Sequence, residues 1–587
     1  MIHLTLQSRL REAFARALPE AEADVSVRPC ADPKFGDYQC MSVMPLAKQL
    51  KTNPRQLATA VIEALEVDDL CESVEVAGPG FLNFKVRRSA FEAVCREAAR
   101  GEHLFFAKTD APRSVVVDFS SPNVAKPMHV GHIRSTILGD CLARLFRLLG
   151  HRVVSDNHIG DWGTQFGMLL VGWKKHLDAA ALEADPIAEL ERIYKLVNAE
   201  CKADPEVLET ARAELVRLQA ADDENLGIWK RMIDLSKVQF ETIYRRLGVT
   251  FDETLGESFY NARLADVVGA LQSQGIARES EGAICVFSDH QLPQKEDPFL
   301  IHRDGEWQDS PVLVQKKDGG FNYATTDLAT LQYRLETWQP TEVVYVTDGR
   351  QQLHFRQIFN AFRRWRPDVE VKLAHVWFGS ILGDDGKPFK TRSGDTVKLA
   401  DLLDEAEERA RRIVEEKNPD LPEETKAEVA RVVGIGAVKY ADLLPNRQSD
   451  YVFSWDKMLS LQGNTAPYLQ YAFTRIRSIF RKADGEGIDT QIDPDALSLN
   501  EETELALCRK LLEFGIVLNQ VGEDYRPNLL CNYLFELAGC FSRFFECCPV
   551  LKSAPEERSS RLVLCDLTAR VLRQGLDVLG IGVTEVM

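Results

Sequence analysis

The sequence lacks the commonest signatures of nucleotide and zinc sites. It contains neither a P-loop (GxxxxGK followed by Ser or Thr) nor a GxGxxG fingerprint, so an ATP-using protein of this sequence needs some other phosphate site. It also contains no CxxC and no HExxH, which are spacings typical of bound zinc.

Long apolar runs and paired cysteines are missing as well. No uninterrupted apolar stretch approaches membrane-spanning length. Residues 1–23 have apolar side chains at helical spacing but are interrupted by charges, which predicts an amphipathic helix rather than a signal peptide. The 13 cysteines are scattered, and Cys547–Cys548 is the only adjacent pair, which is typical of reduced thiols in the cytoplasm. We therefore expect a cytoplasmic protein without a membrane segment, and a monomer.

The charge balance is acidic, with a formal net charge of −18 over 587 residues. This argues against nonspecific binding to nucleic acid, but it leaves room for a local basic surface. Such a surface is predicted at residues 463–483, which contain no acidic residue. Basic and aromatic side chains interleave there, as selective RNA contact requires: Tyr468, Tyr471, Phe473, Arg475, Arg477, Phe480, Arg481 and Lys482.

The most informative segment is residues 115–140, VVVDFSSPNVAKPMHVGHIRSTILGD. Its apolar start predicts a buried strand, and the apolar spacing over 129–149 predicts a helix. His129 and His132 then fall in the first helical turn, where backbone N–H groups and the helix dipole favour a polyphosphate. Gly131 leaves room for the flat face of a base to approach the backbone.

An HxGH string alone leaves other interpretations open. It also resembles the motif of small cytidylyltransferases, and it can be a structural turn. Two histidines at this spacing can ligate zinc only with at least a third ligand. The surrounding strand, turn and helix favour nucleotide binding.

The length suggests roughly three to four domains, and the pattern divides the chain into three. Residues 1–106 read as a small α+β domain. Residues 107–405 alternate strands and helices, with expected strands at 153–154, 283–286, 311–314 and 342–348, which indicates a Rossmann-like parallel sheet with a helical insertion at about 176–246. Residues 406–587 are helical by periodicity and predict an all-α bundle. The expected fold class is α/β with these two flanking domains.

Eight segments resemble the arginyl-tRNA synthetase family, in the same order along nearly the whole chain, and HVGH resembles the HIGH signature of class I synthetases. They are KFGDYQ (34–39), GPGFLNF (78–84), SPNVAKPMHVGH (121–132), NHIGDWGTQFG (157–167), YATTDLA (323–329), DGKPFKTRSG (385–394), VGIGAVKYADL (433–443) and GNTAPYLQYA (463–472).

The resemblance implies a reaction in which the carboxylate of L-arginine attacks the α-phosphorus of ATP, with Mg²⁺ on the phosphates, before transfer to the terminal ribose of tRNA(Arg). Because the substrate supplies the nucleophile, catalysis depends on alignment and on cations at the transition state. The residues implied in ATP binding are Pro122, Asn123, Val124, Ala125, Lys126, Pro127, Met128, His129, Val130, Gly131, His132, Lys390 and Arg392.

The second class I signature, KMSKS, departs from its usual form. It appears as Pro388-Phe389-Lys390-Thr391-Arg392-Ser393, without the second lysine. Lys126, just before the histidines, can supply the missing charge from the other side of the phosphates. The catalytic set implied by the resemblance is Lys126, His129, His132 and Lys390.

A guanidinium is a planar fork of donors, so arginine recognition calls for rigid carboxylate and carbonyl acceptors. Tyr323 and Asp327 are four residues apart and share one helix face. The positions matched to the arginine site of the family are Asp118, Asn123, His132, Tyr323, Asp327 and Gln351.

The resemblance further implies two tRNA contacts, at the elbow through the N-terminal domain and at the anticodon through the helical domain. The implied residues are Phe35, Tyr38, Gln39, Asn464, Tyr468, Tyr471 and Arg475. Members of the family typically need bound tRNA before they activate arginine, and we expect this here.

Three alternatives remain to be tested. Another class I synthetase is the nearest, although a cysteinyl enzyme needs Cys/His metal ligands, and glutamyl or glutaminyl enzymes need cationic or amide groups where Asp118 and Asp327 lie. A non-catalytic tRNA-binding paralogue predicts loss of the HVGH or Lys390 segments. A small nucleotidyltransferase leaves the terminal matches unexplained.

Overall fold

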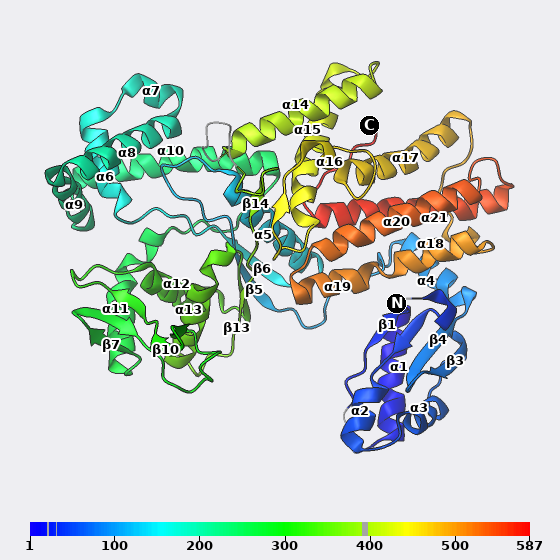
Figure 1. The fold of residues 1–587 in the computed structure, drawn as a ribbon. Coiled ribbons are helices and arrows are strands. Elements are labelled where there is room, and N and C mark those ends of the chain that lie inside the picture. The colour runs from blue at the N-terminus through cyan, green and yellow to red at the C-terminus, as the bar shows by residue number, and fades with distance from the viewer. Residues whose placement is uncertain (20–22, 31, 390–396) are drawn as a thin grey trace.

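The computed structural model describes residues 1–587 except 20–22, 31 and 390–396. In Figure 1 an N-terminal unit, in blue, projects from the rest of the molecule beside the helix labelled α18. The central sheet, labelled at β5 and β6, lies between the C-terminal helices, which include α18, and the helices coloured cyan and green. No helix in the described part of the chain has the length and apolar character that a bilayer crossing needs.

The N-terminal unit is built on a four-stranded antiparallel sheet with the strand order β1-β2-β4-β3. Strand β4 begins and ends where the alternating pattern FLNFKV predicts. The helix that follows, α4, leads out of this unit and packs against the C-terminal helices. The bounds are α1 (Ile2–Ala17), β1 (Val27–Pro29), β2 (Tyr38–Cys40), α2 (Val43–Leu50), α3 (Pro54–Glu63), β3 (Cys71–Ala77), β4 (Phe81–Val86) and α4 (Arg88–Arg100).

The central sheet is parallel, with the strand order β13-β12-β5-β6. The valines of β5 are fully buried, as expected for a parallel strand covered on both faces. The register pairs Asp118 with Asp156 and with Tyr345, so the carboxyl ends of three strands meet at one edge. The strands are β5 (Ser114–Asp118), β6 (Arg152–Asp156), β12 (Glu342–Tyr345) and β13 (Lys372–His375).

Two strands assigned to this sheet from the sequence lie elsewhere. β8 and β11, at the predicted positions, pair in a separate antiparallel sheet of order β11-β8-β7, and β9 and β10 form a hairpin. Alternation with helices cannot distinguish these arrangements, because strand direction depends on partners far away in the sequence. The bounds are β7 (Ala277–Ser280), β8 (Ala283–Val286), β9 (Leu300–Arg303), β10 (Glu306–Asp309) and β11 (Val312–Gln315).

Three helices complete the central domain around the site. α5 (Val130–Leu148) follows β5, and α12 (Tyr323–Trp338) and α13 (Gln352–Trp365) flank β12 in the sequence. A further helix, α11 (Asn261–Ser273), packs against α12. The amino-terminal ends of α5, α12 and α13 carry most of the predicted substrate residues.

Five helices, α6 to α10, follow one another over residues 165–247, where the sequence predicts a helical insertion. Asp178, Asp185, Asp204 and Asp222 accept hydrogen bonds from the first-turn N–H groups of successive helices, which explains the starts of these helices. Pro186 and Pro205 occupy first-turn positions, where a missing N–H is tolerated. The bounds are α6 (Gln165–His176), α7 (Ala179–Ala184), α8 (Pro186–Ala203), α9 (Pro205–Gln219) and α10 (Asp223–Leu247).

The C-terminal part is a bundle of helices, as predicted. The motif VGIGAVKYADL lies in α15 and is buried almost all round. A Cβ on Gly434 would lie 2.6 Å from the carbonyl oxygen of Ala406, so this glycine permits the close packing of α14 and α15. The bounds are α14 (Leu399–Lys417), α15 (Glu423–Leu443), α16 (Trp455–Met458), α17 (Ala466–Gly485), α18 (Glu502–Leu512), α19 (Phe514–Asp524), α20 (Asn528–Cys547) and α21 (Pro555–Val578).

A buried ion pair joins the bundle to the central domain. Arg134 on α5 lies 2.9 Å from Asp442 on α15, and the two side chains are 1% and 0% exposed. Arg134 also donates to the carbonyl oxygens of Gly379 and Ser449, which flank the short parallel pair β14 (Ile381–Leu382) and β15 (Tyr451–Val452). Burial raises the pKa of Asp442, and the charge of Arg134 opposes that shift.

We predict that Arg134→Met lowers the free energy of unfolding by about 3–5 kcal/mol, because the Asp442 carboxylate is left buried without its guanidinium. The measurement is the shift in the midpoint of urea unfolding. Arg431→Met, which removes a half-exposed pair with Glu428, is the matched control and should change stability by about 1 kcal/mol or less. Equal effects of the two substitutions would contradict the role given to burial.

Candidate functional site

The first turn of α5 holds its two histidines in one defined arrangement. His129 caps the helix: its Nδ1 accepts from the backbone N–H of Gly131 at 3.0 Å, and the Nδ1 of His132 accepts from the N–H of His129 at 3.1 Å. The ring centroids are 4.0 Å apart. Because both Nδ1 atoms accept, the neutral rings carry their proton on Nε2. A Cβ on Gly131 would lie 2.8 Å from the ring of His129, so the glycine makes room for this ring.

The two imidazoles are neutral donors at pH 7. Burial lowers the pKa of His132 to about 3, with a smaller contribution from His129. Burial also lowers the pKa of His129, and the charge of Lys126 adds to this effect. Two Nε2–H groups therefore stand at the positive end of a helix dipole, an arrangement that can receive an anion.

The turn between β5 and α5 is strained and held by polar contacts. Ser120, Ser121 and Ala125 have φ values of +73°, +49° and +61°, a region that non-glycine residues adopt rarely. The hydroxyl of Ser120 lies 2.8 Å from the hydroxyl of Tyr244, and the N–H of Ser121 donates to Oδ1 of Asn157 at 3.1 Å. Contacts with Tyr244 and Asn157 therefore hold this turn in a conformation that its own residues disfavour.

Most side chains in the segment predicted to bind ATP, residues 122–132, are at least partly buried and so shape the loop rather than face solvent. The side chains of Pro122, Val124, Ala125, Met128 and Val130 are buried, whereas Asn123 is exposed. Gly160, in the loop after β6, exchanges backbone hydrogen bonds with Pro122 and Val124. The two loops that follow β5 and β6 therefore lie side by side at the carboxyl edge of the sheet.

The predicted cations have different positions. The Nζ of Lys126 lies 5.2 Å from the ring centroid of Tyr194 on α8, within cation–π range. Lys390 and Arg392 lie outside the described residues. The chain on the far side of that gap runs beside the histidines, because the N–H of Val130 donates to the carbonyl oxygen of Val397 at 3.0 Å.

Asp118, a predicted arginine ligand, is engaged within the protein. Its Oδ2 accepts from Nη2 of Arg334 at 2.6 Å, and the same Nη2 donates to Asp156 at 2.7 Å. Arg334 is fully buried on α12. This ion-pair network joins the ends of β5 and β6 to α12, so Asp118 acts here as part of the framework. A direct contact between Asp118 and arginine stays a prediction.

Three other predicted arginine residues, Tyr323, Asp327 and Gln351, lie at the starts of α12 and α13. Tyr323 and Asp327 share one face of α12, as their spacing predicts, and Tyr323 is 60% exposed. Gln351 is exposed in the short turn before α13. His354 on α13 contacts both α12 residues: its Nε2 lies 2.5 Å from Oδ2 of Asp327, and its ring packs edge-on against Tyr323. Sequence reasoning missed His354, although its place three residues after Gln351 was a usable signal.

A second residue that sequence reasoning missed is Glu257, which lies in the 3-10 turn Glu257–Tyr260. Its carboxylate joins that of Asp327 as a candidate partner for a cation. Burial raises the pKa of Glu257 to about 7; His158 opposes the shift, and Asp327 and Asp161 add to it. Asp161 accepts from the N–H and hydroxyl of Ser258. The turn that carries Glu257 packs against α12, which carries Asp327. A buried carboxylate with a raised pKa and a second carboxylate therefore belong to two elements in contact, an arrangement suited to a cation. No local pattern in the sequence indicates that residues 257 and 327 are neighbours.

The three N-terminal tRNA candidates differ in access. Phe35 is 52% exposed, Gln39 is half-buried and donates to Asn83, and Tyr38 is only 4% exposed. The ring of Tyr38 therefore packs in the core, because the alternation of β2 turns it inward. Asp37 in the same motif binds Arg509 of α18 at 2.6 Å, so the motif also ties the N-terminal unit to the bundle.

The C-terminal tRNA candidates lie on and before α17. Tyr471 is 46% exposed, Tyr468 packs against Phe535, and the guanidinium of Arg475 lies over the ring of Phe545. Two arginines of the predicted basic stripe, Arg477 and Arg481, instead bind Glu585 near the C-terminus. Within the basic surface predicted at residues 463–483, these two arginines are therefore already engaged by Glu585 within the protein.

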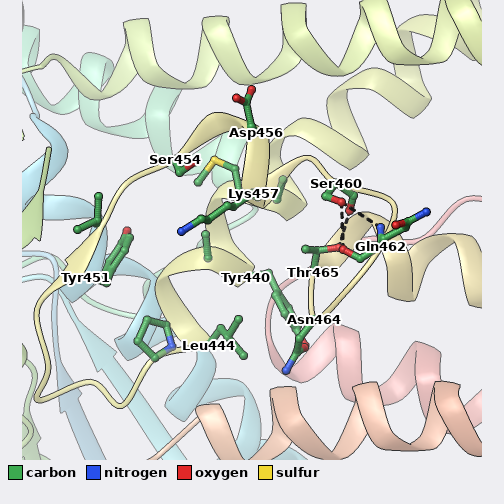
Figure 2. A pocket seen from close by; sticks show the side chains of 15 residues that line it. Tyr440, Leu444, Tyr451, Ser454, Asp456, Lys457, Ser460, Gln462, Asn464 and Thr465 are labelled. Carbon is green, nitrogen blue, oxygen red and sulfur yellow. Dashed lines mark hydrogen bonds between the residues drawn. The ribbon is translucent and has the colours of Figure 1, made fainter. Parts of the chain in front are cut away.

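A cavity of about 590 Å³ lies beside Asn464, between α15, α16 and the loop before α17. In Figure 2 Asn464 lies next to Tyr440, and Tyr451 lines the opposite end of the cavity. The hydroxyl of Tyr440 lies within hydrogen-bond distance of two acceptors, Oδ1 of Asn464 and the carbonyl oxygen of Cys531. The lining of this cavity includes none of the residues predicted to bind ATP or arginine.

Comparisons with known proteins cover all three parts of the chain. The family model described as "tRNA synthetases class I (R), catalytic domain" matches residues 98–455. The model described as "Arginyl tRNA synthetase N terminal domain" matches residues 4–86, and "DALR anticodon binding domain" matches residues 469–587.

Full-length relatives and solved structures agree with these matches. The chain is 46% identical to the arginine–tRNA ligase of Synechococcus sp., over 99% of both chains, and 46% identical to that of Chromobacterium violaceum, over 100% of both. Its fold is similar to arginyl-tRNA synthetase from Plasmodium falciparum, with 30% identity, a TM-score of 0.82 and 100% and 99% coverage. For the Thermus thermophilus arginyl-tRNA synthetase the identity is 25% and the TM-score 0.80, with full coverage of both chains.

Proposed function

Because the chain belongs to the arginyl-tRNA synthetase family and is therefore an arginine–tRNA ligase, we propose a role for each group of residues in its site. The catalytic-domain match over residues 98–455, together with full-length ligases at 46% identity, excludes the non-catalytic paralogue. The matches at both termini exclude a small nucleotidyltransferase with unrelated extra domains. As a class I synthetase the enzyme uses ATP, and its other substrates are L-arginine and tRNA(Arg).

In the first step, MgATP lies across the start of α5. The Nε2–H groups of His129 and His132 donate to phosphate oxygens, and Lys126, Lys390 and Arg392 supply positive charge as the α-phosphorus becomes pentavalent. A carboxylate oxygen of arginine bonds to that phosphorus, the bond to the bridging oxygen breaks, and pyrophosphate leaves. Residues 122–132 shape the ATP site, with Gly131 nearest the base.

The guanidinium of arginine binds between Asp327 and Glu257, with Tyr323, Gln351, Asn123 and His132 around the rest of the substrate. The observation that carries this assignment is the grouping of Asp327, Tyr323 and His354 at the starts of α12 and α13, beside the turn that carries Glu257. Burial raises the pKa of the Glu257 carboxyl to about 7, and the charge of Asp327 adds to this shift. A buried carboxylate is destabilised in its charged form until a cation pairs with it. Arginine provides that cation.

We predict that arginine affinity falls by about tenfold per pH unit below pH 7, because binding to protonated Glu257 requires loss of one proton. The sign follows from the direction of the shift: the free site has a pKa of about 7, and a bound guanidinium lowers it. Above pH 7 the affinity should be constant. Calorimetry of arginine binding in buffers of different ionisation enthalpy measures the released proton.

Glu257→Gln is the control for this pH dependence. The variant should bind arginine more weakly at pH 8 and show no slope between pH 5.5 and pH 7, because the amide does not titrate in that range. A slope that persists in the variant assigns the titration to another group of the pocket, namely Asp161, His158 or Asp327.

In the second step, a hydroxyl of the terminal ribose of tRNA, the 2′-OH in class I enzymes, attacks the carbonyl of arginyl-adenylate, and AMP leaves. We assign residues 1–106 to the tRNA elbow, 107–405 to catalysis and 406–587 to the anticodon. Phe35 and Gln39 are available at the first surface, and Asn464, Tyr468, Tyr471 and Arg475 at the second. A cytoplasmic location and a monomeric state stay predictions.

Pyrophosphate exchange into ATP, with each of the twenty amino acids and with or without tRNA, tests the proposal. We expect exchange with arginine alone, and only when tRNA is added. Exchange with another amino acid would overturn the assignment of the arginine pocket. Exchange with arginine in the absence of tRNA would contradict the expected coupling to tRNA and leave the chemistry intact.

A further inference from the structure

His354 connects the carboxylate and the aromatic ring that we assign to arginine recognition. Its Nε2 lies 2.5 Å from Oδ2 of Asp327, and the side chains of His354 and Asp327 are 15% and 23% exposed. The His354 ring centroid is 4.8 Å from that of Tyr323, at an interplanar angle of 61°. One side chain on α13 thus contacts two side chains on α12.

The position of His354 within the site is itself constrained. It lies in the first turn of α13, which begins at Gln352, and its ring packs against that of Phe355 at 5.3 Å. Phe355 is buried, at 4% exposure, and packs in turn on Tyr345 at the end of β12. The core of the central domain therefore holds the imidazole against Asp327.

This contact matters because an aspartate near the surface has several accessible rotamers, and a guanidinium recognises only a carboxylate in a defined orientation. The hydrogen bond to Oδ2 fixes the carboxylate plane and leaves Oδ1 for the substrate. At metal sites, loss of the partner that orients a ligating side chain typically costs about 10–100-fold in affinity or activity, and we expect an effect of the same order here.

We propose that His354 is a positioning residue of the arginine site, which orients Asp327 through Nε2–H and supports Tyr323 through its ring. The inference deepens the proposed function and rests on the role given there to Asp327. It predicts that the hydrogen-bond donor and the ring of His354 make separable contributions.

Two substitutions separate the donor from the ring. His354→Phe keeps an aromatic ring against Tyr323 and removes the donor, whereas His354→Gln keeps an amide donor close to the position of Nε2. In pyrophosphate exchange with tRNA present, we expect the Phe variant to raise the KM for arginine about tenfold or more. The KM for ATP and the kcat at saturating arginine should stay within about twofold, and the Gln variant should recover most of the lost affinity.

A specificity readout distinguishes orientation from general damage to the fold. Citrulline is a neutral isostere of arginine, so its exclusion depends on a correctly oriented carboxylate. His354→Phe should bind arginine more weakly while its weak binding of citrulline stays unchanged. His302→Phe, the same substitution at an exposed position on β9, is the control and should leave all constants unchanged.

A double-mutant cycle with Asp327→Ala completes the test. If His354 acts through Asp327, the Phe substitution should have almost no further effect on arginine KM in the Asp327→Ala background. Additive effects, or a Phe variant with wild-type arginine KM, would overturn the inference. If Asp327→Ala itself leaves arginine KM unchanged, the proposed arginine site fails as well, so the two failures are distinguishable.

Discussion

Replacing His132 with alanine is expected to slow arginyl-adenylate formation by about 10²–10³-fold, while tRNA binding stays near the wild-type value. The magnitude is that of one preorganised donor lost from a developing oxyanion. The neutral imidazole keeps its proton on Nε2 because Nδ1 accepts from the N–H of His129. Pyrophosphate exchange measures the chemical step, and filter binding measures the affinity for tRNA.

Two conservative variants separate donation from helix capping. His132→Asn keeps an acceptor near the position of Nδ1 and lacks the Nε2–H donor, so it should be as slow as the alanine variant. His132→Gln keeps a donor near Nε2 and should retain more activity. An active Asn variant would show that His132 only caps the helix, and a parallel loss of tRNA binding would point to a structural role.

Asp327→Ala is expected to raise the KM for arginine by roughly 30-fold or more, equivalent to about 2 kcal/mol or more, because a desolvated charge partner of the guanidinium is removed. The KM for ATP should change by no more than about twofold, since the start of α5 is untouched. Exchange kinetics at varied arginine and varied ATP measure both constants. Equal effects on the two substrates would exclude Asp327 as a guanidinium acceptor.

Asp327→Asn provides the matched control for charge. The amide has nearly the same shape, so a large arginine effect in this variant identifies the negative charge as the cause. Glu257 is still present in this variant, so the pH dependence of arginine binding should remain. A flat pH profile in Asp327→Asn would mean that Asp327, rather than Glu257, carries the titration near pH 7.

Features that depend on near neighbours could be predicted well. The buried strand around 115–117 and the helix start at His129 follow from local patterns and are present as expected. Helices also occupy residues 165–247, where the sequence predicts a helical insertion. The capping arrangement of His129, Gly131 and His132 involves residues at most three apart. Short-range periodicity and capping are therefore sufficient for the nucleotide end of the site.

Features that depend on distant partners were missed or placed wrongly. The strands β8 and β11 have the expected positions but lie in an antiparallel sheet, because the pattern of one strand does not identify its partner. The partner of Asp118, Arg334, lies 216 residues later in the chain, so the ion pair between them has no local signal. The burial of Tyr38 likewise depends on the packing of the N-terminal core. The roles of Asp118 in arginine binding and of Tyr38 in tRNA binding stay predictions.

The proposed arginine site likewise combines residues that local sequence predicts with residues that only folding brings together. The pairing of Tyr323 with Asp327 can be predicted from the sequence, because a spacing of four residues brings two side chains to one helix face. Glu257 and His354 join that pair only after folding, 70 residues before and 27 residues after Asp327. Local sequence is enough for the start of α5, where we propose that phosphate binds, because the hydrogen bonds of His129 and His132 close within one helical turn. Packing alone brings together the carboxylates that we propose for arginine, because burial and charge depend on which elements meet.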